Sequence, residues 1–267
     1  MNLNLIRKTV SDRWRGISVY AGGLAAYVLF LCALYPTFRK ALAVKQFFAK
    51  NYPQALLKFF GVKSFDVSSF NNYIVLELLT IIWVVIVGAF VIGFARYMIA
   101  GEVEEGTLEF LLSQPIKRWK VLTSEGSVLA AGIAGLVVTT VLSVFIFGKA
   151  FGFRVSYAGF LAFAPLGFAL FIAMAGYSIF FSALFREARR ALMASAAVIF
   201  GFYLLHFAAG YSRVVDKIDY LGIFHYYDPL GVLNSGGVPV RDVLVLLAFG
   251  IALFCIALWI FQRKDIT

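Results

Sequence analysis

Six runs of at least 18 residues without Asp, Glu, Lys or Arg divide the chain. The hydrocarbon core of a bilayer, roughly 30 Å thick, needs about 20 apolar residues when an α-helix crosses it. Each run therefore predicts a transmembrane helix, the second of them beginning near Tyr73, and an even number of crossings places both chain ends on one side. The runs are Gly16–Phe38, Leu78–Ala95, Gly126–Gly148, Val155–Phe185, Ala191–Ser212 and Val243–Gln262.

The composition supports this all-α membrane fold. Hydrophobic residues make up 62% of the 267 residues and charged residues only 14%, whereas soluble domains average about 25% charged residues. We therefore predict one transmembrane domain over residues 1–267. In such a chain the net charge of +10 favours anionic lipid headgroups over nucleic acid as partners. Cys32 and Cys255 indicate neither a disulfide framework nor a metal site.

Residues 1–16 predict an amphipathic helix that lies in the headgroup plane, with a frayed, solvated N-terminus as the alternative. Basic side chains cover one side of this helix. The apolar positions of the other side recur at helical spacing: Leu3, Ile6, Val10, Trp14 and Ile17.

The distribution of Lys and Arg favours cytoplasmic chain ends, because the inner segments then hold 13 of these residues in 56 positions and the outer segments 11 in 70. Residues 39–72 and 211–242 become extracytoplasmic loops that are apolar enough to contain short surface helices. Aromatic residues near the predicted boundaries fit two interfacial belts. The inner belt has Trp14, Trp119 and Trp259, and the outer belt has Tyr35, Tyr73, Tyr157, Tyr211, Tyr226 and Tyr227.

Small residues mark two features of the predicted bundle. Pro165 followed by Gly167 predicts a kink in the long fourth span. Ala131 and Gly135, four residues apart, would let two helices approach closely, although ordinary packing explains them too.

Motifs for catalysis are absent from the sequence. No G-x-x-x-x-G-K-[ST] loop is present to bind ATP, and His206 and His225 lack the spacing of a zinc protease. Glu77, near the outer end of the second span, is either a functional intramembrane carboxylate or a side chain that reaches the interface. His206 is more typical of a hydrogen-bonded packing residue than of a ligand. We predict no catalytic residue, no metal site and no cofactor in this chain.

The segment between the second and third spans, residues 99–124, carries the strongest functional signal. Gly106 is expected to end one helix, residues 107–113 to form a short amphipathic helix, and Pro115 to start another. Four glutamates, Glu102, Glu104, Glu105 and Glu109, accompany an apolar patch at Leu108, Leu111 and Leu112. Because acidic side chains suit anionic lipid poorly, the segment predicts a cytoplasmic protein partner.

From Glu102 to Arg118 the chain reads E-x-x-x-G-T-L-E-x-L-L-S-x-P-I-x-R, which resembles the signature loop of ABC-2-type transporter permeases. The resemblance extends to the six spans and to the tail at residues 261–266. It implies the membrane subunit of an ATP-driven exporter in a prokaryotic plasma (inner) membrane, paired with a second permease copy or a close relative. It also implies two cytoplasmic ATPase subunits that bind ATP and Mg²⁺. The coupling element that would dock into the ATPase comprises Glu102, Glu105, Gly106, Thr107, Glu109, Leu112 and Pro115.

The same resemblance implies a translocation path at the dimer interface, lined by the second and fifth spans. Candidate path residues are Glu77, Gly88, Tyr203 and His206. A path lined mainly by Phe, Leu and Ala favours a hydrophobic or amphiphilic substrate such as a drug, a lipid or a peptide-like molecule. The alternatives are an ATP-independent secondary transporter or channel, and a membrane assembly factor that transports nothing. Lys117 and Ser124-Glu125 depart from the family pattern.

Overall fold

A computed structural model describes residues 3–48, 69–106 and 117–263, and these ranges are helical without any strand. The long helices are α1 (Leu3–Phe48), α4 (Ile82–Arg96), α7 (Arg118–Ala150), α8 (Tyr157–Leu184), α9 (Ala188–Ala209) and α12 (Val240–Arg263). The short elements are α3 (Phe70–Ile74), η1 (Val75–Leu79), η2 (Tyr97–Gly101), α5 (Glu102–Glu104), α10 (Arg213–Asp216), η3 (Asp219–Leu221), η4 (Ile223–Tyr226) and α11 (Pro229–Ser235).

Six helical segments of the described chain are long and apolar enough to cross a membrane, which confirms the predicted number. The second segment combines α3, η1, α4, η2 and α5 and begins three residues before Tyr73. All six include the core of a predicted run. They are Ile6–Arg39, Phe70–Glu104, Arg118–Ala150, Tyr157–Leu184, Ala188–Ala209 and Val240–Arg263.

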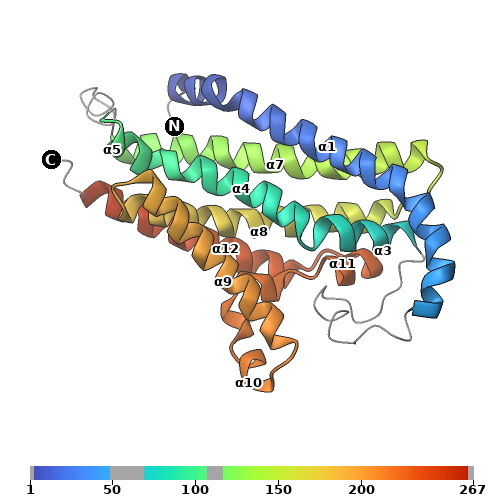
Figure 1. Ribbon diagram of the computed structural model, residues 1–267. Helices are drawn as coiled ribbons and strands as arrows, with labels where there is room; N and C mark the ends of the chain where they lie inside the picture. Colours follow the sequence, from blue (N-terminus) through green and yellow to red (C-terminus); the bar gives the residue numbers. More distant parts are fainter. Residues whose placement is uncertain (1–2, 49–68, 107–116, 264–267) are drawn as a thin grey trace.

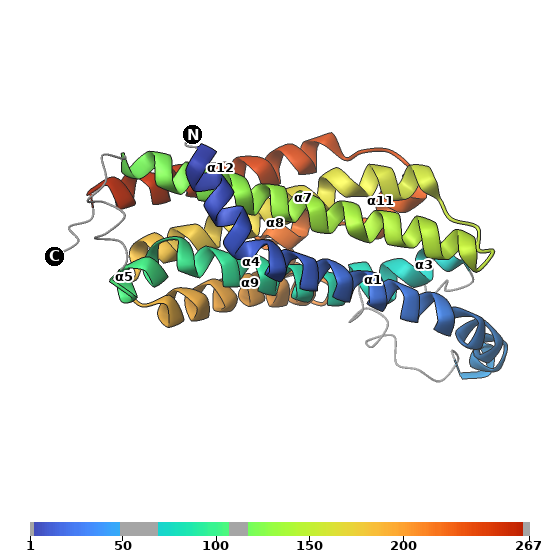
Figure 2. The same ribbon diagram turned by 90° about the horizontal axis from the view of Figure 1, so that it is seen from above.

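The helix α8 lies in the middle of the bundle and contacts α4, α7, α9 and α12, while α1 packs mainly along α7 (Figures 1 and 2). The start of α1, the short α5 and the end of α12 lie at one end of the bundle, and α3 and α11 lie at the other (Figure 1). The start of the first span and the end of the last span therefore lie on the same side, as an even number of crossings requires. We call the end with α5 the α5 end.

Trp83 of α4 joins three helices in the core. Its side chain is fully buried, its indole Nε1 donates a 2.9 Å hydrogen bond to Oγ1 of Thr140 on α7, and its ring lies 4.7 Å from that of Phe171 on α8. Gly167 of α8 leaves room for this indole, because a Cβ at that position would lie 2.8 Å from a ring carbon of Trp83. Gly167 thus permits close packing of α8 against α4. The helix α8 itself continues through Pro165 as one helix.

A close helix crossing joins α8 and α12 through two glycines. A Cβ on Gly176 would lie 2.5 Å from the carbonyl oxygen of Gly250, and a Cβ on Gly250 would lie 2.6 Å from that of Ile172. The small residues predicted for close approach, Ala131 and Gly135, are instead exposed on α7, and no other part of the described chain lies within 4 Å of a Cβ built on Gly135.

The N-terminal part of the chain forms one long helix, where the sequence predicted a surface helix followed by a separate first span. Residues 3–48 form one helix, so no break at Gly16 separates residues 1–16 from the first span. In this part Ile6 and Ile17 pack against the core, while Val10 and Trp14 are exposed. The helix also continues beyond Phe38, through Pro36, to Phe48, and its last part turns away from the bundle (Figure 1). Residues 49–68 of the predicted outer loop lie outside the described residues.

Part of the predicted outer aromatic belt belongs to the core. Tyr35 is 4% exposed, and its ring lies 5.2 Å from the ring of Tyr73 and 5.0 Å from that of Phe153. Tyr73 is fully buried as well, whereas Tyr157 and Tyr211 are exposed. Hydrophobic runs indicate the depth of a residue in the bilayer but not the side of the helix that faces its neighbours, which explains the difference.

The segment between the fifth and sixth spans contains short helical elements, as its apolar residues predict. Ile223 and Phe224 of η4 are buried, and α11 packs on α8. The turn predicted at residues 234–237 is present, because α11 ends at Ser235 and Gly236 takes a left-handed φ of 65°. Such a φ favours glycine at the end of a helix.

Candidate functional site

The predicted coupling element begins where the second span ends. The helix stops after Glu104, and Gly106 takes a left-handed φ of 69° while its N–H donates to the carbonyl of Val103 over 3.2 Å. The prediction that Gly106 ends this helix is therefore confirmed. Glu102 is half-buried and Glu105 is exposed. Thr107, Glu109, Leu112 and Pro115 lie outside the described residues, so the predicted short helix stays a prediction.

A π-helical turn, η2, precedes this end of the span and is tied to α8. The N–H groups of Ile99 and Ala100 donate to Oγ of Ser182 over 3.3 and 3.0 Å, and the same hydroxyl donates to the carbonyl of Arg96 over 3.2 Å. A π-turn disturbs the usual backbone ladder and is frequent at functional sites. The Ser182 hydroxyl thus links the end of the second span to the fourth.

Glu104 connects the same end to the fifth span. Its Oε2 accepts a 2.7 Å hydrogen bond from the N–H of Ala188, the first residue of α9. The first N–H groups of a helix lack partners within the helix, and negative charge is favourable there. Sequence reasoning missed this role, because the two residues are 84 positions apart. The one local signal is that residues 184–187 offer no Ser, Thr, Asp or Asn to cap α9.

A cavity of about 250 Å³ lies between the first turns of α1, the end of the second span and the start of α7. Arg13 stands over two of its aromatic walls, with the guanidinium carbon 5.3 Å from the ring centre of Phe94 and 5.2 Å from that of Tyr97. Oε2 of Glu125 is fully buried and has no hydrogen-bond partner. The cavity is lined by Lys8, Thr9, Asp12, Arg13, Phe94, Tyr97, Met98, Glu102 and Glu125.

Two of the four candidate path residues lie within the second span. Glu77 is half-buried in η1, close to Tyr27 of α1 and Tyr73 of α3. Gly88 is buried, and a Cβ there would lie 2.7 Å from the terminal methyl carbon of Met174 on α8. The structure therefore places Glu77 on η1 near α1, and Gly88 at the contact between α4 and α8.

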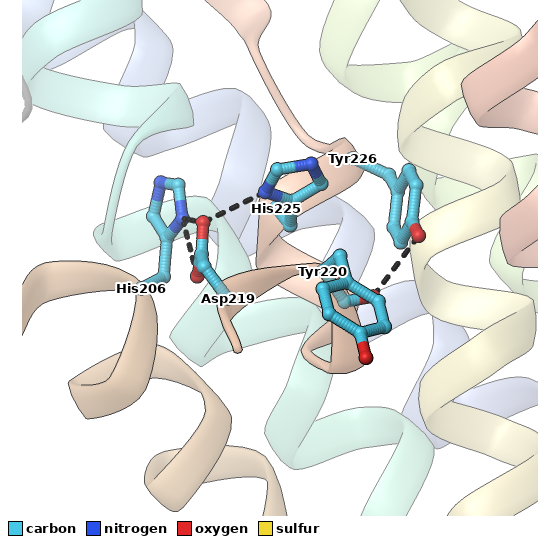
Figure 3. A network of polar contacts seen from close by, with 5 residues as sticks. All are labelled: His206, Asp219, Tyr220, His225 and Tyr226. Atoms are coloured by element: carbon cyan, nitrogen blue, oxygen red, sulfur yellow. Dashed lines mark hydrogen bonds and ion pairs between the residues drawn. The ribbon is translucent and has the colours of Figure 1, made fainter. Parts of the chain in front are cut away.

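The other two candidates lie on α9 (Figure 3). Tyr203 is half-buried, with its ring 5.4 Å from that of Phe224. Nδ1 of His206 lies 3.1 Å from Oδ2 of Asp219, and Nδ1 of His225 lies 2.8 Å from the same oxygen. Asp219 is 4% exposed. Because an ionised carboxylate only accepts hydrogen bonds, both histidines are assigned a proton on Nδ1. We call these three residues the His–Asp–His clasp.

The clasp shows that His206 is hydrogen-bonded, and it joins the end of α9 to η3 and η4. Within the described residues no group of three or more His, Cys, Asp and Glu side chains is arranged to hold a metal ion. Close by in sequence, the hydroxyl of Tyr227 donates to the carbonyl of Leu79 over 2.8 Å. Burial raises the pKa of the Tyr227 phenol well above its ordinary value, so this group stays a neutral donor.

Replacing Asp219 with Asn should lower the free energy of unfolding by about 1–2 kcal/mol, because both histidines lose their hydrogen bond to a charged acceptor. The thermal midpoint of the detergent-solubilised protein measures this change. Asp216→Asn, an exposed position of α10, is the matched control and should leave the midpoint unchanged. An equal midpoint for both variants would contradict a stabilising role for the clasp.

The fold and these contacts define a multi-pass helical membrane protein. A family model described as ABC-2 family transporter protein matches residues 3–266. The chain therefore belongs to the ABC-2 transporter family, and it is a transmembrane permease of the ABC transporter class. Members of this family are generally non-catalytic membrane subunits that associate with ABC ATPases. A comparison with curated proteins and one with solved structures each return no match.

Proposed function

We propose that this permease is the membrane subunit of an ABC exporter that moves a hydrophobic or amphiphilic substrate with ATP hydrolysed by a separate subunit. Two ATPase subunits bind ATP and Mg²⁺ on the cytoplasmic side and dock on the coupling element at Glu102–Pro115. The chain ends then lie in the cytoplasm, and the protein resides in the plasma (inner) membrane of a prokaryote. The observation that carries the proposal is that the end of the second span, where this element begins, is tied to the fourth and fifth spans.

Rigid coupling is the physical basis of the mechanism. Ser182 ties η2 to α8, and Glu104 ties α5 to the start of α9. A force applied by the ATPase on the adjoining loop therefore acts on the second, fourth and fifth spans together. Such a movement lets the permease shift between two packings with inward and outward access.

A dimer through the fifth span completes the proposed exporter. The helix α9 contacts α4 within the chain (Figure 2), yet its apolar residues Met193, Phe200 and Leu204 are all exposed. Extended apolar exposure marks an interaction surface or lipid contact. A second copy of the permease, or a close relative, would cover this face and enclose a path between the second and fifth spans.

Purification of the tagged permease from its native membranes tests the proposal. We expect a separate chain with an ATP-binding loop to co-purify, and the reconstituted complex to transport an amphiphile in liposomes only when ATP and Mg²⁺ are present. Transport by the purified permease without ATP would instead indicate a secondary transporter. A complex whose ATPase rate responds to no amphiphile, and that transports none, would indicate an assembly factor.

A further inference from the structure

The cavity between α1, the second span and α7 combines charges of both signs. Lys8, Asp12 and Arg13 reach it from α1, Glu102 from α5, and Glu125 from α7. Its volume of about 250 Å³ is below the roughly 300–1,000 Å³ of pockets that hold drug-sized ligands. A small polar group with both a positive and a negative charge therefore fits this cavity better than a whole drug molecule.

The strongest indication of a ligand is the unpaired side chain of Glu125. Its Oε2 is fully buried without a hydrogen-bond partner, which is a costly arrangement for a carboxylate. Glu102, Arg13 and Lys8 are close enough to act on Glu125 electrostatically. Arg13 lines the same cavity but is held over the rings of Phe94 and Tyr97. The cavity thus offers a carboxylate oxygen that needs a donor.

The position of the cavity points to a lipid as the source of that donor. It lies at the α5 end of the bundle, and Trp14, Trp119 and Trp259 are exposed on the ends of α1, α7 and α12 that gather there (Figure 1). Tryptophan is enriched where membrane helices meet the headgroup layer. Lipid headgroups therefore lie at the level of the cavity.

We propose that this cavity binds the phosphoethanolamine headgroup of an aminophospholipid. The primary ammonium donates to Glu125 and Glu102, and the phosphate lies against Lys8 and Arg13. A primary ammonium has three N–H donors, whereas a trimethylammonium group has none and leaves Oε2 of Glu125 unpaired. The site therefore discriminates ethanolamine from choline headgroups. A bound headgroup also fixes the start of α1 to the coupling end of the second span.

Native mass spectrometry of the detergent-solubilised protein with short-chain phosphatidylethanolamine and phosphatidylcholine tests the proposal. We expect the ethanolamine lipid to bind about tenfold more tightly, as a charge-assisted hydrogen bond would give. Glu125→Gln keeps the size of the side chain and should reduce this preference to about twofold or less, because the carboxylate charge is lost. The matched control Glu187→Gln, at an exposed position outside the cavity, should keep the wild-type preference.

Two results would overturn the proposal. Equal affinity for both lipids in the wild-type protein, or an unchanged preference in Glu125→Gln, would show that the cavity does not select an ammonium group. Free phosphoethanolamine is added in a separate arm. If it displaces the lipid at an equal concentration, the source of the headgroup is a soluble molecule and the lipid assignment is wrong. Because lipid binding is measured without an ATPase, these results are independent of the proposed exporter function.

Discussion

Replacing Glu105 and Glu109 together with Lys is expected to weaken binding of the ATPase by at least about tenfold, and with it substrate-stimulated ATP hydrolysis. Glu105 is exposed just beyond α5, so it is free to meet a partner, and Glu109 follows in the same acidic segment. Reversing charges at a complementary interface introduces repulsion that costs several kcal/mol. Co-purification of the ATPase and the hydrolysis rate of the reconstituted complex measure the two effects.

The matched control makes the same change of charge at two positions away from the coupling element. Asp216→Lys with Asp242→Lys alters α10 and the start of α12, where Asp216 is exposed and Asp242 is half-buried. This control should retain the ATPase and its stimulated activity. If the Glu105 and Glu109 double variant also retains both, the ATPase does not dock on this acidic segment and the coupling assignment is wrong.

The span count was predictable because a bilayer imposes a simple requirement on composition. A helix that crosses it has to exclude charge over about 20 residues, and charge-free runs are visible without any knowledge of packing. The position of Gly106 was predictable for a similar reason, since its left-handed φ of 69° is a local property of a helix end. Features that depend on one segment of the chain alone can thus be read from the sequence.

The contacts that give the coupling region its connections depend on distant segments. Glu104 and Glu105 are neighbours of the same chemical type, yet only Glu104 meets Ala188. Similarly, Glu125 stands among the polar residues Thr123, Ser124 and Ser127, a setting typical of a surface residue, whereas its Oε2 is buried against α1 and the second span. Periodicity predicts that a helix exists, but the side of it that faces each neighbour follows from the packing of the whole bundle.

Close helix packing illustrates the same limit. Ala131 and Gly135 have the spacing expected of a helix contact, but they are exposed on α7. The actual crossing uses Gly176 and Gly250, two residues 74 positions apart in sequence that are recognisable as partners only when α8 and α12 are brought together. A small residue permits close approach without specifying the helix that approaches.

Replacing Gly176 with Leu is therefore expected to lower the free energy of unfolding by about 3 kcal/mol or more, the upper end of the cost of overpacking a core. The atoms that a new Cβ would meet are the backbone O, Cα and C of Gly250, at 2.5, 2.8 and 3.0 Å. Backbone atoms cannot rotate away as a side chain would, so α12 has to move from α8. The thermal midpoint and the yield of monodisperse protein in detergent measure the loss.

Gly135→Leu separates this clash from the general effect of a larger residue within a helix. Apart from its own helix and chain neighbours, no atom of the described chain lies within 4 Å of a Cβ built on Gly135. Leu is also a better helix former than Gly, by somewhat less than about 1 kcal/mol. The control should therefore keep or raise the thermal midpoint. Equal losses in the two variants would mean that both helices resist a larger side chain for a reason other than the α8–α12 crossing. A loss confined to Gly176→Leu identifies this crossing as the contact that holds the last span against the centre of the bundle.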